Sequence, residues 1–245
     1  FGGLAMNSDT AMPADSGTMA DDFSAMLKAG MTLKGDLKIA SITGNLDMVT
    51  KDEEGQMRPV ALKMDSADNA LTFAIDQARI NYAGVSGATK GELTVPDFPV
   101  PMGYGLTDTK FNVDFPIAVS DQPQNFTVSY LLNGVTMTDS IWALFDPQAA
   151  LPRDPASIDV DLAGSIKVLR DFFDPATMEA AAKMEDPNLS DEQRAALMEE
   201  MMAPPVDLRD ITINKVALNM LGAKADVTGK LAAPEQGDMQ EPVGT

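Results

Sequence analysis

Residues 31–39, MTLKGDLKI, decide the fold class, because apolar and polar side chains alternate along them. The apolar positions are Met31, Leu33, Leu37 and Ile39. Successive side chains of a β-strand point to opposite faces, so a period of two places these residues together on one face. The stretch therefore predicts a strand with one buried and one solvated face.

Runs of the same kind recur along the chain. They lie at 45–50, 58–65, 70–76, 78–83, 90–95, 107–113, 125–132, 157–166, 216–220 and 223–228. Turn-forming residues at 51–55 and 67–69 separate some of them, and Leu221-Gly222 reads as a hairpin turn. Short strands at this spacing predict an antiparallel meander.

Helical patterns interrupt the strands at three places. Met19, Phe23, Met26 and Leu27 share one helical face, and Gly30 stands where a C-terminal glycine cap belongs. A short helix is predicted at 138–145. Asp174-Pro175 and the capping box Ser190–Gln193 predict a helical pair over 175–202. The predicted class is therefore mainly β with α (α+β): a large curved antiparallel sheet of meandering strands with a helical insertion at about 168–203.

The domain organisation follows from these patterns. Residues 1–17 are small, polar and Met-rich, and we expect an irregular segment there. Residues 18–245 read as a single β-rich domain fragment, with a boundary between two lobes near 118–122 as the alternative. Phe1 is not an initiator Met, and 241–245 stop where a strand would start. Both ends are expected to be truncated.

Composition excludes several classes of chemistry. The 37 acidic and 18 basic residues give a net charge of −19, which repels phosphate backbones and argues against nucleic acid as a partner. The chain has no Cys and no His. It therefore lacks thiolate nucleophiles, the usual general base and most transition-metal ligands. No run of 18 apolar residues occurs, so the sequence predicts no membrane-spanning segment in this fragment.

Short matches to catalytic motifs are weak. Asp15-Ser16-Gly17 is half of an aspartic-protease signature, whose chemistry needs two such loops. Ser165 and Lys167 share the polar face of one predicted strand, where a solvated pair is the favoured interpretation over a nucleophile and base. Gly103-Tyr104-Gly105 lacks the other glycines of a phosphate loop and reads as a bend in a strand.

Acidic clusters offer oxygen ligands for calcium. They are Asp52/Glu53/Glu54, Asp65/Asp68 and Asp159/Asp161. None has the 12-residue loop spacing of a calcium-binding hand, so solvated turns and strand faces are the favoured interpretation. The sequence thus predicts no catalytic residue, no metal site and no cofactor.

The 17 methionines are an excess. Four of them in the predicted helical pair are candidates for an apolar groove: Met178, Met198, Met201 and Met202. Methionine fills irregular cores and also lines adaptable binding surfaces. Core filling, a groove for lipid or a partner, and oxidant scavenging remain open as interpretations.

The block at 136–155, TMTDSIWALFDPQAALPRDP, holds the single tryptophan and two proline-locked turns. Its signature residues are Trp142, Phe145, Asp146, Pro147, Pro152, Arg153, Asp154 and Pro155. We expect a structural role: Arg153 would reach Asp154 or turn carbonyls, and Trp142 would plug the open face of the sheet.

With this block, the chain resembles the alphaproteobacterial family known as domain of unknown function 2125. That resemblance implies an exported or periplasmic protein, with a signal peptide or anchor upstream of this fragment. It assigns no catalytic residues. The strands at 216–231 also resemble those of AsmA-like periplasmic proteins, in which long curved sheets cradle lipid.

Three functional hypotheses follow. The first is a non-enzymatic periplasmic protein that binds lipid or another apolar ligand in a groove lined by the sheet. The second is a structural or assembly factor of the cell envelope that binds a protein partner through a sheet edge. The third, a carboxylate-based hydrolase, is the least supported, because 37 acidic residues single out no pair.

Overall fold

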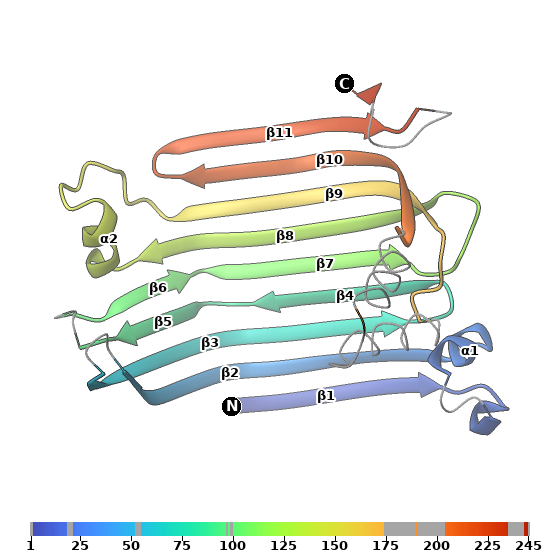
Figure 1. The fold of residues 1–245 in the computed structure, drawn as a ribbon, viewed down its shortest axis with the longest axis horizontal. Helices are drawn as coiled ribbons and strands as arrows, with labels where there is room; N and C mark the ends of the chain where they lie inside the picture. The colour runs from blue at the N-terminus through green and yellow to red at the C-terminus, as the bar shows by residue number, and fades with distance from the viewer. Residues whose placement is uncertain are drawn as a thin grey trace.

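The computed structural model describes residues 2–18, 22–51, 55–96, 98, 100–173, 190, 204–234 and 243–244. One antiparallel sheet of 12 strands dominates this part of the chain (Figure 1). The prediction of a mainly β chain built on one large antiparallel sheet is confirmed.

The strands follow the alternating runs, although several are longer than predicted. The first six are β1 (Gly2–Ala11), β2 (Thr32–Lys51), β3 (Met57–Ile75), β4 (Arg79–Ser86), β5 (Thr89–Thr94) and β6 (Met102–Leu106). The others are β7 (Asp108–Pro116), β8 (Gln124–Met137), β9 (Ala156–Val168), β10 (Val206–Met220), β11 (Ala223–Ala232) and β12 (Val243–Gly244).

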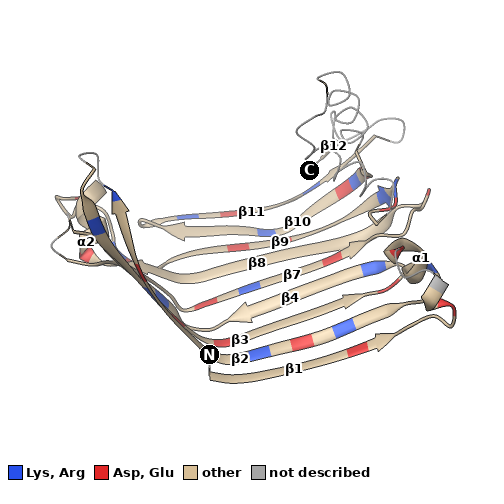
Figure 2. Cartoon of the chain, turned by 60° about the horizontal axis from the view of Figure 1, so that its bottom comes forward, with Lys and Arg blue, Asp and Glu red and all other residues tan. Residues whose placement is uncertain are grey.

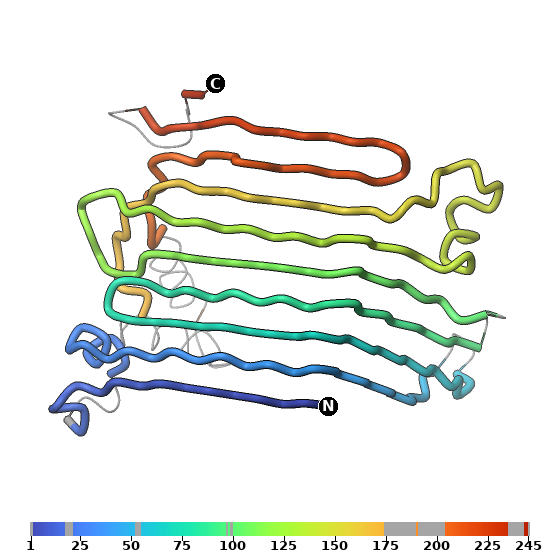
Figure 3. The backbone as a smooth tube through the Cα atoms, turned by 180° about the vertical axis from the view of Figure 1, so that it is seen from behind, coloured from blue at the N-terminus to red at the C-terminus, as the bar shows by residue number. Residues whose placement is uncertain are grey.

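The strand order is a meander with one excursion. The main path runs β1-β2-β3-β4-β7-β8-β9-β10-β11-β12, and β5 and β6 lie off it. β3 pairs with β5 through its first half and with β4 through its second half. β8 likewise pairs with β7 and then with β6. β4 and β5 therefore lie end to end alongside β3, and β7 and β6 lie end to end alongside β8 (Figure 3).

Two short α-helices lie at opposite ends of the strands (Figure 1). The helix α1 (Phe23–Lys28) begins after Asp22, whose carboxylate accepts a hydrogen bond from the Ala25 N–H at 2.8 Å. Gly30 follows with a φ of 99°, the left-handed conformation that a glycine cap supplies. The helix α2 (Asp139–Phe145) connects β8 to β9. α1 contains Phe23, Met26 and Leu27 of the helix predicted from Met19 to Leu27, and α2 matches the helix predicted at 138–145.

Four sequence-based expectations need correction or lie outside these residues. The irregular segment predicted for 1–17 is wrong for residues 2–11, which form β1 and pair with β2. The turn predicted at 67–69 lies inside β3. The predicted helical insertion at about 168–203 falls mostly on 174–189 and 191–203, which are not described. The lobe boundary proposed near 118–122 falls between β7 and β8, which are neighbours in the same sheet.

Cross-strand pairing shows that the sheet has one apolar and one polar face. Directly paired residues share a face, and one row of pairs runs through Leu37, Leu71, Gly84, Phe111, Tyr130 and Val160. It continues through Val216 and Val227. We call the side that carries this row the apolar face, and the opposite side the charged face.

A line of irregular residues crosses the sheet at right angles to the strands. Gly3, Asp68 and Gly134 have φ values of 61°, 52° and 67° on β1, β3 and β8. The Ser66 hydroxyl contacts Asn69 at 2.8 Å and Ser86 at 2.9 Å, although strict alternation would place Ser66 and Asn69 on opposite faces. The left-handed residue between them therefore shifts the alternation by one position, as a bulge does.

This shift explains a change of pattern in the sequence. Before it, β2 carries apolar residues at odd positions such as Leu37 and Ile39; after it, they stand at even positions such as Ile42 and Leu46. Ile42 pairs with Ser66, whose side chain has crossed to the apolar face. The apolar face therefore continues beyond the irregular line and reaches the end of the sheet that carries α2.

The described core occupies the opposite end of the apolar face. Leu27 and Met31 pack there against Ile75 and Ile117, with Phe173 beside them. A second buried cluster is formed by Phe126, Ile166 and Val168, against which Phe172 packs. Phe172 belongs to both clusters, so α1 and the segment after β9 together cover this end of the sheet.

Truncating a side chain in that core tests the position of the buried end. Ile166 is 2% exposed, whereas Ile158 on the same strand is 37% exposed. Ile166→Ala is expected to lower the free energy of unfolding by about 2–4 kcal/mol, because it leaves a cavity. Ile158→Ala is the matched control and should cost less than half as much. Urea unfolding of both variants measures the difference, and equal losses would contradict the assignment.

Candidate functional site

In the described part of the chain, most of the apolar face away from α1 is exposed. Large apolar side chains on it remain open to solvent: Met6 is 66% exposed, Val227 is 50% exposed, and Tyr82 and Tyr130 are 42% exposed. Beyond the irregular line the same holds for Leu46, which is 50% exposed. Soluble proteins rarely expose continuous apolar patches of more than a few hundred square ångströms, and those that do use them for binding.

Glycines under aromatic rings flatten this face. A Cβ atom added to Gly35 would lie 2.5 Å from the ring of Phe73, and one on Gly84 would lie 2.4 Å from Phe111. The ring of Tyr104 covers Gly91 in the same way at 2.3 Å. Each ring can lie directly over the glycine of the adjacent strand, because glycine has no side chain. The result is a low, smooth apolar surface.

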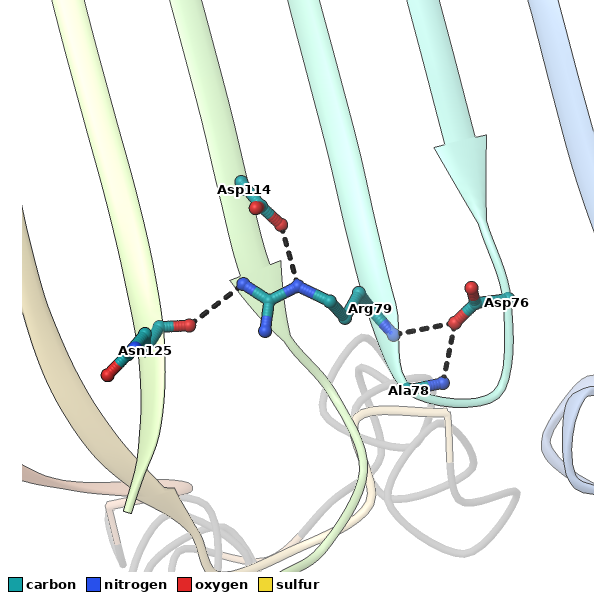
Figure 4. A network of polar contacts seen from close by, with 5 residues as sticks. All are labelled: Asp76, Ala78, Arg79, Asp114 and Asn125. Atoms are coloured by element: carbon teal, nitrogen blue, oxygen red, sulfur yellow. Dashed lines mark hydrogen bonds and ion pairs between the residues drawn. The ribbon is translucent and has the colours of Figure 1, made fainter.

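Charged side chains gather on the other face, where several are paired. Lys215 contacts Asp159 at 2.5 Å across β10 and β9. Arg79 spans three strands: its Nε donates to Asp114 at 2.8 Å and a terminal nitrogen donates to the Asn125 carbonyl at 2.8 Å (Figure 4). Figure 2 shows that such residues recur along most of the strands. The ion pairs lie between strands that are already paired, so they support the register of the sheet.

The tryptophan block closes one end of the sheet. Trp142 is 5% exposed and lies 4.9 Å from the Phe145 ring, centroid to centroid. The Arg153 guanidinium stands 5.3 Å from the Trp142 ring centroid and forms an ion pair with Asp139. The expected contacts of Arg153 with Asp154 or turn carbonyls are replaced by these two. α2 lies beside the ends of the strands (Figure 1), and Trp142 is part of that end.

The proline turns of this block hold the connection to β9. The buried carboxylate of Asp146 accepts hydrogen bonds from the Ala150 and Leu151 N–H groups at 2.9 and 3.0 Å. Pro152 lies against Gly222, whose added Cβ would come within 2.9 Å of it. The remaining signature residues are exposed: Phe145, Pro147, Asp154 and Pro155. The described contacts of the block are thus all within the chain.

A cavity of about 440 Å³ lies beside α1. Its walls include Leu27 and Phe173, and Ser24, Lys28 and Asp171 form its polar side. The Asp171 carboxylate accepts hydrogen bonds from the Ser24 hydroxyl, from Lys28 at 2.5 Å and from the Phe173 N–H at 2.9 Å. Burial raises the pKa of Asp171, but these three donors outweigh it and hold the pKa below its ordinary value.

The other candidate residues are dispersed. Ser165 donates a hydrogen bond to Asp210 rather than facing Lys167 as a dyad. Gly103-Tyr104-Gly105 lies within β6, so it belongs to a strand as expected. The groove methionines Met178, Met198, Met201 and Met202 lie outside the described residues. Within the described ranges, no three acidic side chains are placed to hold a metal ion.

Sequence reasoning missed the main candidate surface. The sequence predicts the separate strands. The shift of side-chain alternation at the irregular line, however, conceals that their apolar residues lie on one face. The signal was present in β2, where the apolar residues move from odd to even positions between Ile39 and Ile42.

Comparisons with protein-family models, curated proteins and solved structures found no match. In the part of the chain that is described, no helix has both the length and the apolar character needed to cross a membrane. The candidate site is therefore identified from the geometry of the described residues alone.

Tryptophan fluorescence checks the position of α2, because Trp142 is the single tryptophan. The buried indole should emit at shorter wavelength than in urea and should resist quenching by acrylamide. Arg153→Ala removes the guanidinium beside the ring and is expected to increase quenching without unfolding the sheet. Emission from the native protein that matches the unfolded protein would contradict this placement.

The Asp171 cluster predicts a dependence of stability on pH. Because the folded pKa is below the ordinary value of 3.8, ionised Asp171 stabilises the fold above that value. The contribution is lost as the pH falls through the folded pKa. Asp171→Asn should therefore be less stable than the natural chain at pH 7, with a smaller difference near pH 3. Asp121→Asn, an exposed loop residue, is the control and should show little difference at either pH.

Proposed function

We propose that the protein is a non-enzymatic binding protein that holds lipid or another apolar ligand on the apolar face of its sheet. One observation carries the proposal: a continuous apolar face extends from β1 to β11 and leaves large side chains such as Tyr130 exposed. Burying such surface against hydrocarbon gains about 25 cal/mol for each Å² removed from water.

The curvature of the sheet supports a ligand rather than a flat partner. Figure 2 shows the sheet turning up at the α2 end, toward the side on which α1 lies. α1 packs on the apolar face, through Leu27 against Ile75. The apolar face is thus on the inner side of the curved sheet, between a helix at each end of the strands, and we call this curved face the trough.

The setting is proposed from the sequence resemblance. Membership of the family known as domain of unknown function 2125 would place the protein in the periplasm. A trough for apolar ligands suits that aqueous compartment, in which lipids need a protein surface to travel. A helical insertion at about 168–203, with its methionines, remains part of the proposed α+β architecture.

A charge placed on the trough tests the proposal. Tyr130 lies on the apolar face of β8, and Thr127 is an exposed residue on the charged face of the same strand. Tyr130→Glu should weaken binding of the neutral fluorophore N-phenyl-1-naphthylamine at least tenfold, because a carboxylate is costly to bury beside it. Thr127→Glu adds the same charge and should leave binding unchanged.

Native mass spectrometry of the freshly purified protein, followed by lipid extraction, provides the second readout. The natural chain should carry co-purified lipid and Tyr130→Glu should carry less. A clean unliganded mass together with no fluorophore binding would overturn the proposal.

A further inference from the structure

We infer that the trough recognises the hydrocarbon chain of an amphiphile and is indifferent to its headgroup. The inference rests on the proposed function and names the ligand class and the basis of its selectivity. It follows from the distribution of charge over the two faces of the sheet.

The apolar face is almost free of charge in the described strands. Pairing from β1 to β11 assigns one charged residue to it, Arg58, near the outer end of β3. Lys34, Asp36 and Lys38 of β2 all fall on the charged face, as do Lys110 and Asp114 of β7. A ligand that lies on the apolar face therefore meets no counter-charge along most of its length.

Such a surface cannot select a headgroup by ion pairing. An ionised group placed on it would lose its water without a partner, which costs far more than a hydrocarbon contact returns. The headgroup must therefore remain in solvent, beyond the rim of the trough. The net charge of −19 acts on it only at long range and is weakened by salt.

Apart from Arg58, the polar side chains that pairing assigns to this face are uncharged. Ser66, Asn69, Ser86 and Thr89 hydrogen-bond to one another along the irregular line, at 2.8 to 3.2 Å. The three tyrosines, Tyr82, Tyr104 and Tyr130, present ring faces with hydroxyl groups at their tips. The serines and Asn69 satisfy one another, whereas the tyrosine hydroxyls are polar groups on this face that could contact a headgroup.

The smooth apolar face favours a hydrocarbon chain that lies flat along it. Phe73 and Phe111 cover Gly35 and Gly84, so no side chain rises at those two points. Beyond the buried Ile75, β3 from Leu71 to Leu62 gives the trough a length of roughly 30 Å at about 3.4 Å per residue. Each added methylene can therefore remain in contact with the apolar face, up to the length of long acyl chains.

The test separates chain length from headgroup. Lysophospholipids with one headgroup and chains of 10, 12 and 14 carbons are titrated, below their micellar concentrations, against the natural chain carrying N-phenyl-1-naphthylamine. Affinity should rise about fourfold for each added methylene, equivalent to about 0.8 kcal/mol. At 0.5 M salt, choline, ethanolamine and glycerol headgroups on the same chain should differ by less than threefold.

A conservative variant addresses the tyrosines. Tyr82→Phe, Tyr104→Phe and Tyr130→Phe combined remove the hydroxyl groups and keep the rings, and should change no affinity by more than threefold. A tenfold preference among headgroups, or a tenfold loss in the triple variant, would overturn this inference while leaving apolar binding intact. Failure of every amphiphile and of the fluorophore to bind would instead overturn the proposed function itself.

Discussion

The fold depends on keeping apolar side chains on one side of a sheet whose strands are too long for strict alternation. β2 and β3 pair from Lys51 and Met57 at one end to Leu33 and Ile75 at the other. Along the way their apolar positions change from even to odd. Left-handed residues at Gly3, Asp68 and Gly134 absorb the change without breaking the pairing. Without them, half of the apolar positions would lie among the charges of the other face.

The same constraint produces the candidate site. A single sheet with two chemically different faces needs cover on the apolar one. In the described part of the chain, α1 and the residues after β9 supply that cover at one end, where Ile166 and Val168 are buried. Tyr82, Tyr130 and Val227 remain exposed across the rest. Burial at one end of the sheet therefore leaves these apolar side chains exposed over the rest of the described face.

The two helical ends have different physical characters. At α1, Asp171 joins the helix to the sheet through Ser24 and Lys28, and its ionisation ties the contact to pH. At α2, Trp142, Arg153 and Asp139 form a compact contact at the strand ends. The described contacts of the block that distinguishes the sequence thus join α2 to its neighbours, whereas the exposed apolar face is built from valines, leucines and tyrosines.

The sequence by itself determined most of the strands, a helix with Phe23 and Leu27 on one face, a second helix at 138–145 and the hairpin at Leu221-Gly222, because alternation, caps and turn residues act locally. It did not reveal β1, whose polar composition hides a strand held by pairing with β2. It also read 67–69 as a turn, since a left-handed Asp68 has the same local signature in a turn and in a bulge. Only the tertiary structure decided that these irregular residues align across the sheet and make its apolar face continuous, because face and register are properties of paired strands.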